Sequence, residues 1–80
     1  MQESDVIKEL ITLLEKTHSF EQTLNGQTAL IGDLGLESIQ VIEYLCDVED
    51  RFDLIIDEDK LADVQTFDDL AAVVVGLRSA

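Results

Sequence analysis

The sequence predicts an all-α protein, a four-helix arrangement with a long first loop and a short third helix. Apolar residues recur at the spacing of one helix face in three separate segments. The chain contains no proline, the residue that most strongly disrupts helices. Its hydrophobic content of 46% is enough for a packed core. Eighty residues leave room for a single domain, spanning residues 1–80.

We expect the first helix to begin after Ser4, whose hydroxyl can accept hydrogen bonds from the free amides of the first turn. Asp5 and Glu9 suit the positive end of the helix dipole, and Lys16 suits the last turn. One apolar stripe should face the core: Val6, Ile7, Leu10, Leu13 and Leu14.

The segment from Thr17 to Glu37 is predicted to be a loop, because it contains the turn formers Asn25-Gly26, Gly32 and Gly35. A connection of this length is unusual in a compact domain. Its many apolar residues indicate that it packs across the helices: Phe20, Leu24, Leu30, Ile31, Leu34 and Leu36.

The second helix should run from Ser38 to about Phe52. Its core stripe is expected to contain Val41, Ile42, Leu45, Val48 and Phe52. Ile39 and Cys46 lie off this stripe, on a side shared with three acids: Glu43, Asp47 and Asp50. Two apolar residues among acids predict a docking surface for a protein partner. The alternative is that Ile39 and Cys46 pack at the margin of the core.

A short link and a short third helix should follow, and Ile55 and Ile56 of the link are expected to be buried. Asp57 can cap the third helix, which would end near Ala62. Two residues of this region, Leu61 and Val64, are expected to face inward.

The final helix should start at Thr66, because Asp69 three residues later completes an approximate capping box. Its apolar stripe is expected to consist of Phe67, Leu70, Ala71, Val74 and Leu77.

The charge is strongly acidic, with 18 acidic residues against five basic ones and a net charge of −13. Such a field repels nucleic acid and anionic membranes, so we expect neither as a partner. It attracts basic protein surfaces and speeds their encounter. The alternative is that the acids only keep a small domain soluble.

The remaining composition predicts a soluble protein of the reducing cytoplasm, and we expect it to be a monomer. No apolar stretch approaches membrane-spanning length, and no basic segment precedes a hydrophobic one at the N-terminus. The single cysteine, Cys46, excludes an internal disulfide and a cysteine-based zinc site.

Ser38 is the main candidate for chemistry, and it stands at the expected start of the second helix. It could simply be the N-cap of that helix. A helix N-terminus also favours a phosphate ester, because free amides and the helix dipole point at it. A serine hydrolase fits poorly, since His18 is the only histidine and the sequence around Ser38 is not G-x-S-x-G.

A dedicated metal site is not expected. Asp57-Glu58-Asp59 invites comparison with a calcium-binding loop. An EF-hand needs glycine at the sixth position of that loop, where this chain has Ala62.

The segment Asp33-Leu34-Gly35-Leu36-Glu37-Ser38-Ile39 resembles the prosthetic-group attachment motif of acyl carrier proteins. The resemblance extends through the core and acidic positions of the second helix to the short third helix and Thr66-Phe67. It therefore covers nearly all 80 residues.

This resemblance implies an acyl-carrier-like bundle that carries acyl or aminoacyl groups as thioesters. The cargo would be held by the terminal thiol of a 4′-phosphopantetheine arm, not by Cys46. A separate phosphopantetheinyl transferase would join this arm, taken from coenzyme A, to Ser38. The chain itself would not be an enzyme, and Ser38 would need no resident base.

The resemblance also implies partners: acyl- or aminoacyl-loading enzymes, and ketosynthase or condensation-type enzymes with basic docking surfaces. Four acids match family positions that meet Arg and Lys on such partners: Glu37, Glu43, Glu49 and Asp50. Ile39 and Cys46 match exposed apolar positions, and Asp47 lies on the same outer face.

Several residues depart from the family pattern. Glu37 replaces the more usual aspartate before the serine, and Gln40 stands where many fatty-acid carriers have an acid. Asp57 follows Ile56 without the common proline, and no double glycine typical of peptidyl carriers precedes Ser38. These departures weaken the case for a role in primary fatty-acid synthesis and are compatible with a discrete carrier of a specialised polyketide or nonribosomal-peptide pathway. The resemblance as a whole implies a discrete acyl carrier of fatty-acid, polyketide or related biosynthesis. The alternatives are an aminoacyl or peptidyl carrier of nonribosomal peptide synthesis and an unmodified acidic docking module.

Overall fold

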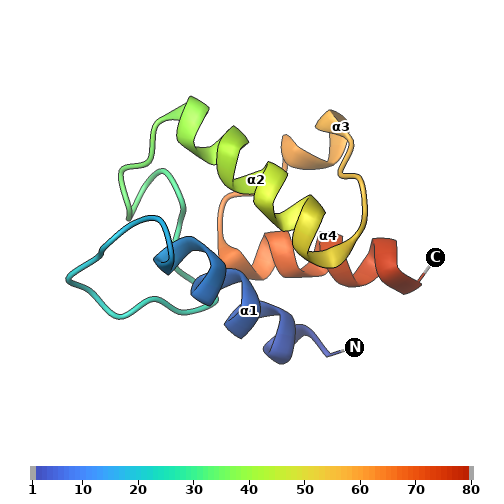
Figure 1. Ribbon diagram of the computed structural model, residues 1–80, viewed down its shortest axis with the longest axis horizontal. Helices are drawn as coiled ribbons and strands as arrows, with labels where there is room; N and C mark the ends of the chain where they lie inside the picture. The colour runs from blue at the N-terminus through green and yellow to red at the C-terminus, as the bar shows by residue number, and fades with distance from the viewer. Residues whose placement is uncertain (1, 80) are drawn as a thin grey trace.

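The computed structural model describes residues 2–79, apart from the side chains of Glu58 and Ser79. Its four helices are α1 (Glu3–Glu15), α2 (Ser38–Phe52), α3 (Glu58–Leu61) and α4 (Phe67–Ser79). The first loop lies at the end of the bundle opposite the two termini (Figure 1). The all-α architecture with a long first loop and a short third helix is therefore confirmed, and α2 has the predicted bounds.

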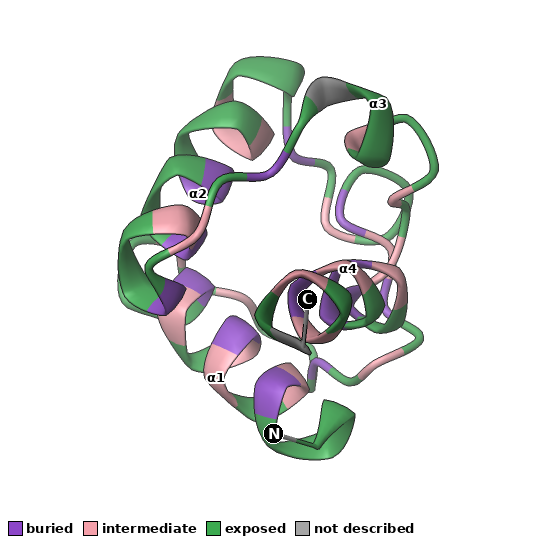
Figure 2. Cartoon of the chain, turned by 90° about the vertical axis from the view of Figure 1, so that its right-hand side faces the viewer, coloured by how far each residue is buried: buried purple, intermediate pink, exposed green. Residues whose placement is uncertain are grey.

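A single core joins the helices and the first loop. Its buried apolar residues are Val6, Leu10, Leu14, Leu24, Leu30, Leu36, Tyr44, Leu45, Val48, Phe52, Ile56, Phe67, Leu70, Ala71 and Val74. Figure 2 shows these buried segments on the inner sides of α1 and α2. Helix α1 packs mainly against α4 and also touches α2.

Within residues 2–79, no helix combines the length and apolarity that crossing a membrane would require.

Helix α1 begins earlier than predicted. Gln2 occupies the N-cap position without a side-chain capping bond, and Ser4 lies inside the helix. The prediction that Ser4 caps α1 is therefore wrong. The helix starts through its backbone alone, because the Val6 amide already donates to the Gln2 carbonyl at 3.1 Å. The predicted core stripe of α1 is confirmed in Val6, Leu10 and Leu14, all fully buried.

The first loop packs across the bundle as predicted, because Leu24, Leu30 and Leu36 are buried. It pairs with the segment that leads into α4. The Leu30 amide donates to the Gln65 carbonyl at 2.9 Å, and Ala29 forms an antiparallel bridge with Thr66. These contacts anchor a loop that is long for so small a domain.

Three isoleucines that the sequence placed in the core are exposed instead. Ile31 is 58% exposed, because the chain enters a tight turn directly after the anchored Leu30. Ile42 is 55% exposed, because Tyr44 and Leu45 are the residues of this part of α2 that are buried in the core. Ile55 is 78% exposed, although Ile56 beside it is buried as predicted.

Helices α3 and α4 start close to their predicted positions. Asp57 occupies the N-cap position of α3, although its side chain makes no capping bond. Before α4, Asp69 Oδ2 accepts hydrogen bonds from the amides of Gln65 at 3.0 Å and Thr66 at 3.1 Å. The Asp69 amide donates back to Thr66 Oγ1 at 3.2 Å. The predicted capping box is thus confirmed.

Candidate functional site

Ser38 is the first residue of α2, and it is exposed. Glu37, in extended conformation at φ −80° and ψ 158°, occupies the N-cap position. The alternative that Ser38 serves as the N-cap is therefore wrong. Among the described contacts, none uses the Ser38 hydroxyl in a hydrogen bond. Its oxygen is open to an incoming group.

Gln40 takes part in the start of α2. Its side-chain Oε1 accepts a hydrogen bond from the Glu37 amide at 2.8 Å, as the third residue of a capping box does. From the sequence alone, Gln40 is only the replacement of an acid. In the structure it fixes the backbone immediately before Ser38.

A compact turn between Ala29 and Leu36 precedes Ser38. Asp33 Oδ2 accepts from the Ala29 amide at 2.8 Å, and the Asp33 amide donates to the Ala29 carbonyl at 3.0 Å. Gly35 adopts φ +68°, a left-handed conformation that glycine reaches at little cost. Leu36 is buried and ties the end of the turn to the core. The motif residues before Ser38 thus hold its backbone in place.

The surroundings of Ser38 suit a phosphate ester better than a nucleophile. The first-turn amides of a helix lack intrahelical partners and, with the helix dipole, favour an anion. The only histidine, His18, is engaged elsewhere: its Nδ1 lies 2.9 Å from Thr17 Oγ1, and its ring stacks on Phe20. Because the one histidine has these other contacts, Ser38 fits a serine that a visiting enzyme modifies.

The outer face of α2 combines apolar and acidic side chains. Ile39 is 58% exposed, and Cys46 is also exposed, so the alternative that both pack at the core margin is wrong. Ile42 is exposed with them, although its helical spacing predicted a place in the core. The acids of this face are exposed as expected: Glu43, Asp47 and Asp50. We call these six residues the outer face of α2.

Glu49 differs from the other predicted docking acids. It is half-buried, and its Oε2 accepts a hydrogen bond from the Ile56 amide at 2.8 Å. It therefore stabilises the link after α2. Glu37 remains exposed beside Ser38.

The acids around α2 are poorly neutralised. Among the described side chains, one ion pair is found, between Arg51 Nη2 and Glu9 Oε1 at 2.8 Å, with both partners about half exposed. The described residues also contain no group of three or more His, Cys, Asp or Glu side chains placed to hold a metal ion. The acidic charge is left facing solvent.

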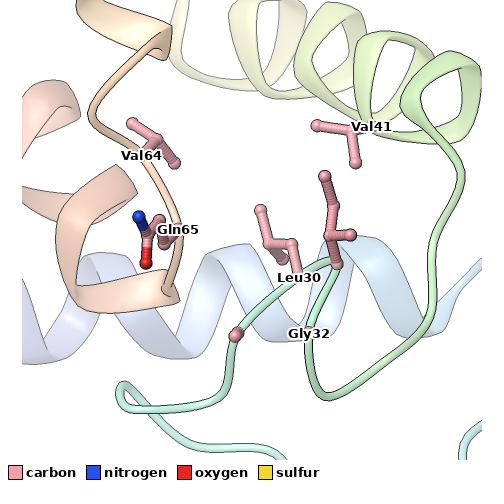
Figure 3. Close-up of a pocket in the computed structure, with 7 residues that line it drawn as sticks. Leu30, Gly32, Val41, Val64 and Gln65 are labelled. Atoms are coloured by element: carbon pink, nitrogen blue, oxygen red, sulfur yellow. The ribbon is translucent and has the colours of Figure 1, made fainter.

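An apolar recess that the sequence pattern did not predict lies beneath the first turns of α2. Leu30, Val41 and Val64 converge on it from three segments (Figure 3). Its volume is about 200 Å³, and its lining comprises Ala29, Leu30, Ile31, Gly32, Val41, Val64 and Gln65. Val41 lies three residues after Ser38, less than one helical turn. Such residues look like ordinary core in a sequence, because the recess arises only where three segments leave space between them.

Known proteins resemble this chain over most of its length. Residues 5–74 match the family described as phosphopantetheine attachment site. An acyl carrier protein of Exiguobacterium sibiricum is 33% identical over 62 residues, which make up 78% of this chain and 78% of that protein.

Proposed function

Since this chain belongs to the acyl carrier protein family, whose domain carries covalent 4′-phosphopantetheine, we propose that Ser38 is its attachment point. Proteins of this family are carriers and do not themselves catalyse the reactions of their cargo. They work with modifying and acyl-handling enzymes. We propose that residues 1–80 form one carrier domain, of which residues 5–74 match the family.

The observation that carries this proposal is the position of Ser38. Its side chain is exposed on the first turn of α2, and Glu37 takes the capping role that would otherwise occupy it. The free amides of that turn favour the charge of a phosphodiester at Ser38 Oγ. The prosthetic group, when bound, supplies the thiol that holds cargo as a thioester. Glu37 and Gln40 keep the serine at a fixed place on the surface.

The cargo we propose is an acyl intermediate of fatty-acid, polyketide or related biosynthesis. The recess below Ser38 has an apolar lining, which favours hydrocarbon over charged groups. An aminoacyl or peptidyl carrier is the second candidate, and the absence of a double glycine before Ser38 argues against it. Loading assays with acyltransferases and with adenylation enzymes distinguish these two cargo classes.

We propose that partner enzymes dock on the outer face of α2 and on Glu37, which lies next to it. Exposed isoleucines provide apolar contact, and the surrounding carboxylates complement basic partner surfaces. Glu49 has a smaller part in this docking, because its carboxylate is already bonded to the Ile56 amide.

The test is modification of the apo-protein by coenzyme A and a broad-specificity phosphopantetheinyl transferase, followed by intact-mass measurement. We expect a gain of one phosphopantetheinyl group in the wild type and none in Ser38→Ala. Ser4→Ala is the matched control, since Ser4 is also exposed in the first turn of a helix. No gain in the wild type, or an equal gain in Ser38→Ala, contradicts the proposal.

A further inference from the structure

Asn25 and Gly26 form a turn at which the first loop meets α4. Asn25 is the only asparagine of the chain, and it is exposed. The Thr28 amide donates to the Asn25 carbonyl at 3.1 Å, and the Asn25 amide donates to Thr28 Oγ1 at 2.9 Å. Because Thr28 is buried, these two bonds hold the main chain of Asn25 in place while its side chain faces solvent.

Contact with α4 favours glycine at position 26. The Gly26 carbonyl accepts a hydrogen bond from the Asp68 amide at 2.8 Å, and a β-carbon on Gly26 would overlap the Asp68 carboxylate. A side chain there would have to displace either that carboxylate or the loop. The Asn25 side chain is therefore followed by a backbone nitrogen that no side chain of its own residue shields.

The groups of this turn suit an attack of the Gly26 nitrogen on the Asn25 side chain. Asparagine is one of the thermolabile residues of proteins. The Gln27 amide donates to Asn25 Oδ1 at 2.8 Å, which polarises the Cγ carbonyl and stabilises negative charge on its oxygen. No hydrogen bond within the described residues 2–79 engages the Gly26 amide or Asn25 Nδ2. The attacking nitrogen and the leaving nitrogen are thus both open to solvent.

We propose that Asn25 is a site of spontaneous covalent modification, which converts its amide through a cyclic imide to aspartate and isoaspartate and loosens the loop from α4. The Gly26 amide loses its proton to solvent, and its nitrogen forms a bond to Asn25 Cγ. The bond between Cγ and Nδ2 then breaks, and Nδ2 takes a proton from water and leaves as ammonia. Such an attack within one chain is favoured because the two reacting groups are already held together.

Water completes the reaction by opening the ring at one of its two carbonyls. Cleavage between the Gly26 nitrogen and Asn25 Cγ gives aspartate with a normal main chain. Cleavage between that nitrogen and the Asn25 carbonyl carbon gives isoaspartate, in which the main chain passes through the former side chain. Either route consumes one water and releases one ammonia, without oxidation or reduction. The chemistry does not involve Ser38, so it holds whether or not the chain is a carrier.

The two products differ in their effect on the loop. Both add a negative charge next to Gly26, whose near neighbour is the Asp68 carboxylate. Isoaspartate also adds a carbon to the main chain, and it turns the carbonyl that binds the Thr28 amide into a free carboxylate. The bond between Gly26 and the Asp68 amide lies directly after the added carbon. We therefore expect isoaspartate to weaken the attachment of the loop to α4 more than aspartate does.

The test keeps the folded full-length chain at mildly alkaline pH, below its melting temperature, and follows the side-chain amides by mass spectrometry of tryptic fragments. Trypsin releases residues 17–51 as one fragment, which contains Asn25 and the exposed glutamines Gln22 and Gln27. We expect conversion at Asn25 to be at least about tenfold faster than at these glutamines, because a longer side chain must close a larger ring. A methyltransferase specific for isoaspartate measures the share of that product.

Gln27→Asn is the matched control, because it places a second asparagine in the same exposed turn, before Thr28 and not before glycine. The new asparagine should convert at least about tenfold more slowly than Asn25. Asn25→Gln should abolish conversion at position 25. Equal rates at the two asparagines, or conversion that occurs only when urea unfolds the chain, overturn the inference.

The effect on the loop is tested by comparing the purified isoaspartate form with Asn25→Asp, which has the added charge and a normal main chain. The isoaspartate form should melt at a lower temperature, and its Asp68 amide should exchange faster with solvent, because the bond to the Gly26 carbonyl is weakened. Equal melting temperatures and equal exchange at Asp68 would overturn the inference that this modification loosens the loop.

Discussion

Tyr44 links two helices through one buried hydroxyl. The side chain is 3% exposed, and its O–H donates to the Leu10 carbonyl at 2.7 Å. Burial raises the pKa of Tyr44 well above its ordinary value of 10.0, and the negative charge of Asp47 raises it further. The hydroxyl therefore stays protonated and remains a donor wherever the protein is folded.

Tyr44→Phe should lower the free energy of unfolding by about 1 kcal/mol, because the hydrogen bond to α1 is lost while the ring still fills the core. Urea unfolding measures this change.

In the wild type, the raised pKa of Tyr44 contributes stability that is present below pH 10 and is lost as the pH rises above it. Tyr44 is the only tyrosine, so tyrosinate absorbance should appear together with unfolding. Ionisation near pH 10 in the folded protein would contradict this prediction.

The start of α4 is stabilised by the capping box between Thr66 and Asp69. The pKa of the Asp69 carboxyl is lowered mainly by the hydrogen bond from the Gln65 amide and next by that from the Thr66 amide. The lowered pKa implies that this carboxylate stabilises the fold above its ordinary pKa of 3.8. That contribution is lost as the pH falls through the lowered value.

Asp69→Asn should therefore melt at a lower temperature than the wild type at pH 7, and the difference should shrink as the pH falls below 3.8. Thermal melts across an acidic pH series measure it. Asp68→Asn is the control, because it removes an exposed charge from the same helical turn. A difference between Asp69→Asn and wild type that is independent of pH, or equal for both variants, would count against the capping role.

At the scale of the whole molecule, we expect repulsion among the acidic side chains to destabilise the fold. The net charge is −13, and one ion pair is found among the described side chains. Exposed charges of one sign at close spacing repel one another, and added ions screen them.

The melting temperature should consequently rise with added sodium chloride or magnesium chloride. Calorimetry or circular dichroism over a salt series gives the slope. A variant with two fewer charges on the outer face of α2, Glu43→Gln with Asp47→Asn, should show a smaller slope. A melting temperature that does not change with salt would show that the acids are spaced too widely to repel.

Features that depend on a few neighbouring residues could be predicted from the sequence. The bounds of α2, the capping box at Thr66 and Asp69, and the turn before Ser38 all follow from local backbone chemistry. The exposure of Ile39 and Cys46 also follows from helical periodicity, since both lie opposite the core stripe.

By itself, the sequence determined the four helices, the acidic second helix and the candidate serine at its start. Only the tertiary structure decided that Tyr44 is buried while Ile31, Ile42 and Ile55 are exposed. It also decided that Glu37, not Ser38, caps α2 and that a recess opens beneath Val41. The physical reason is that periodicity identifies an apolar stripe, whereas burial depends on which distant segment packs against each residue.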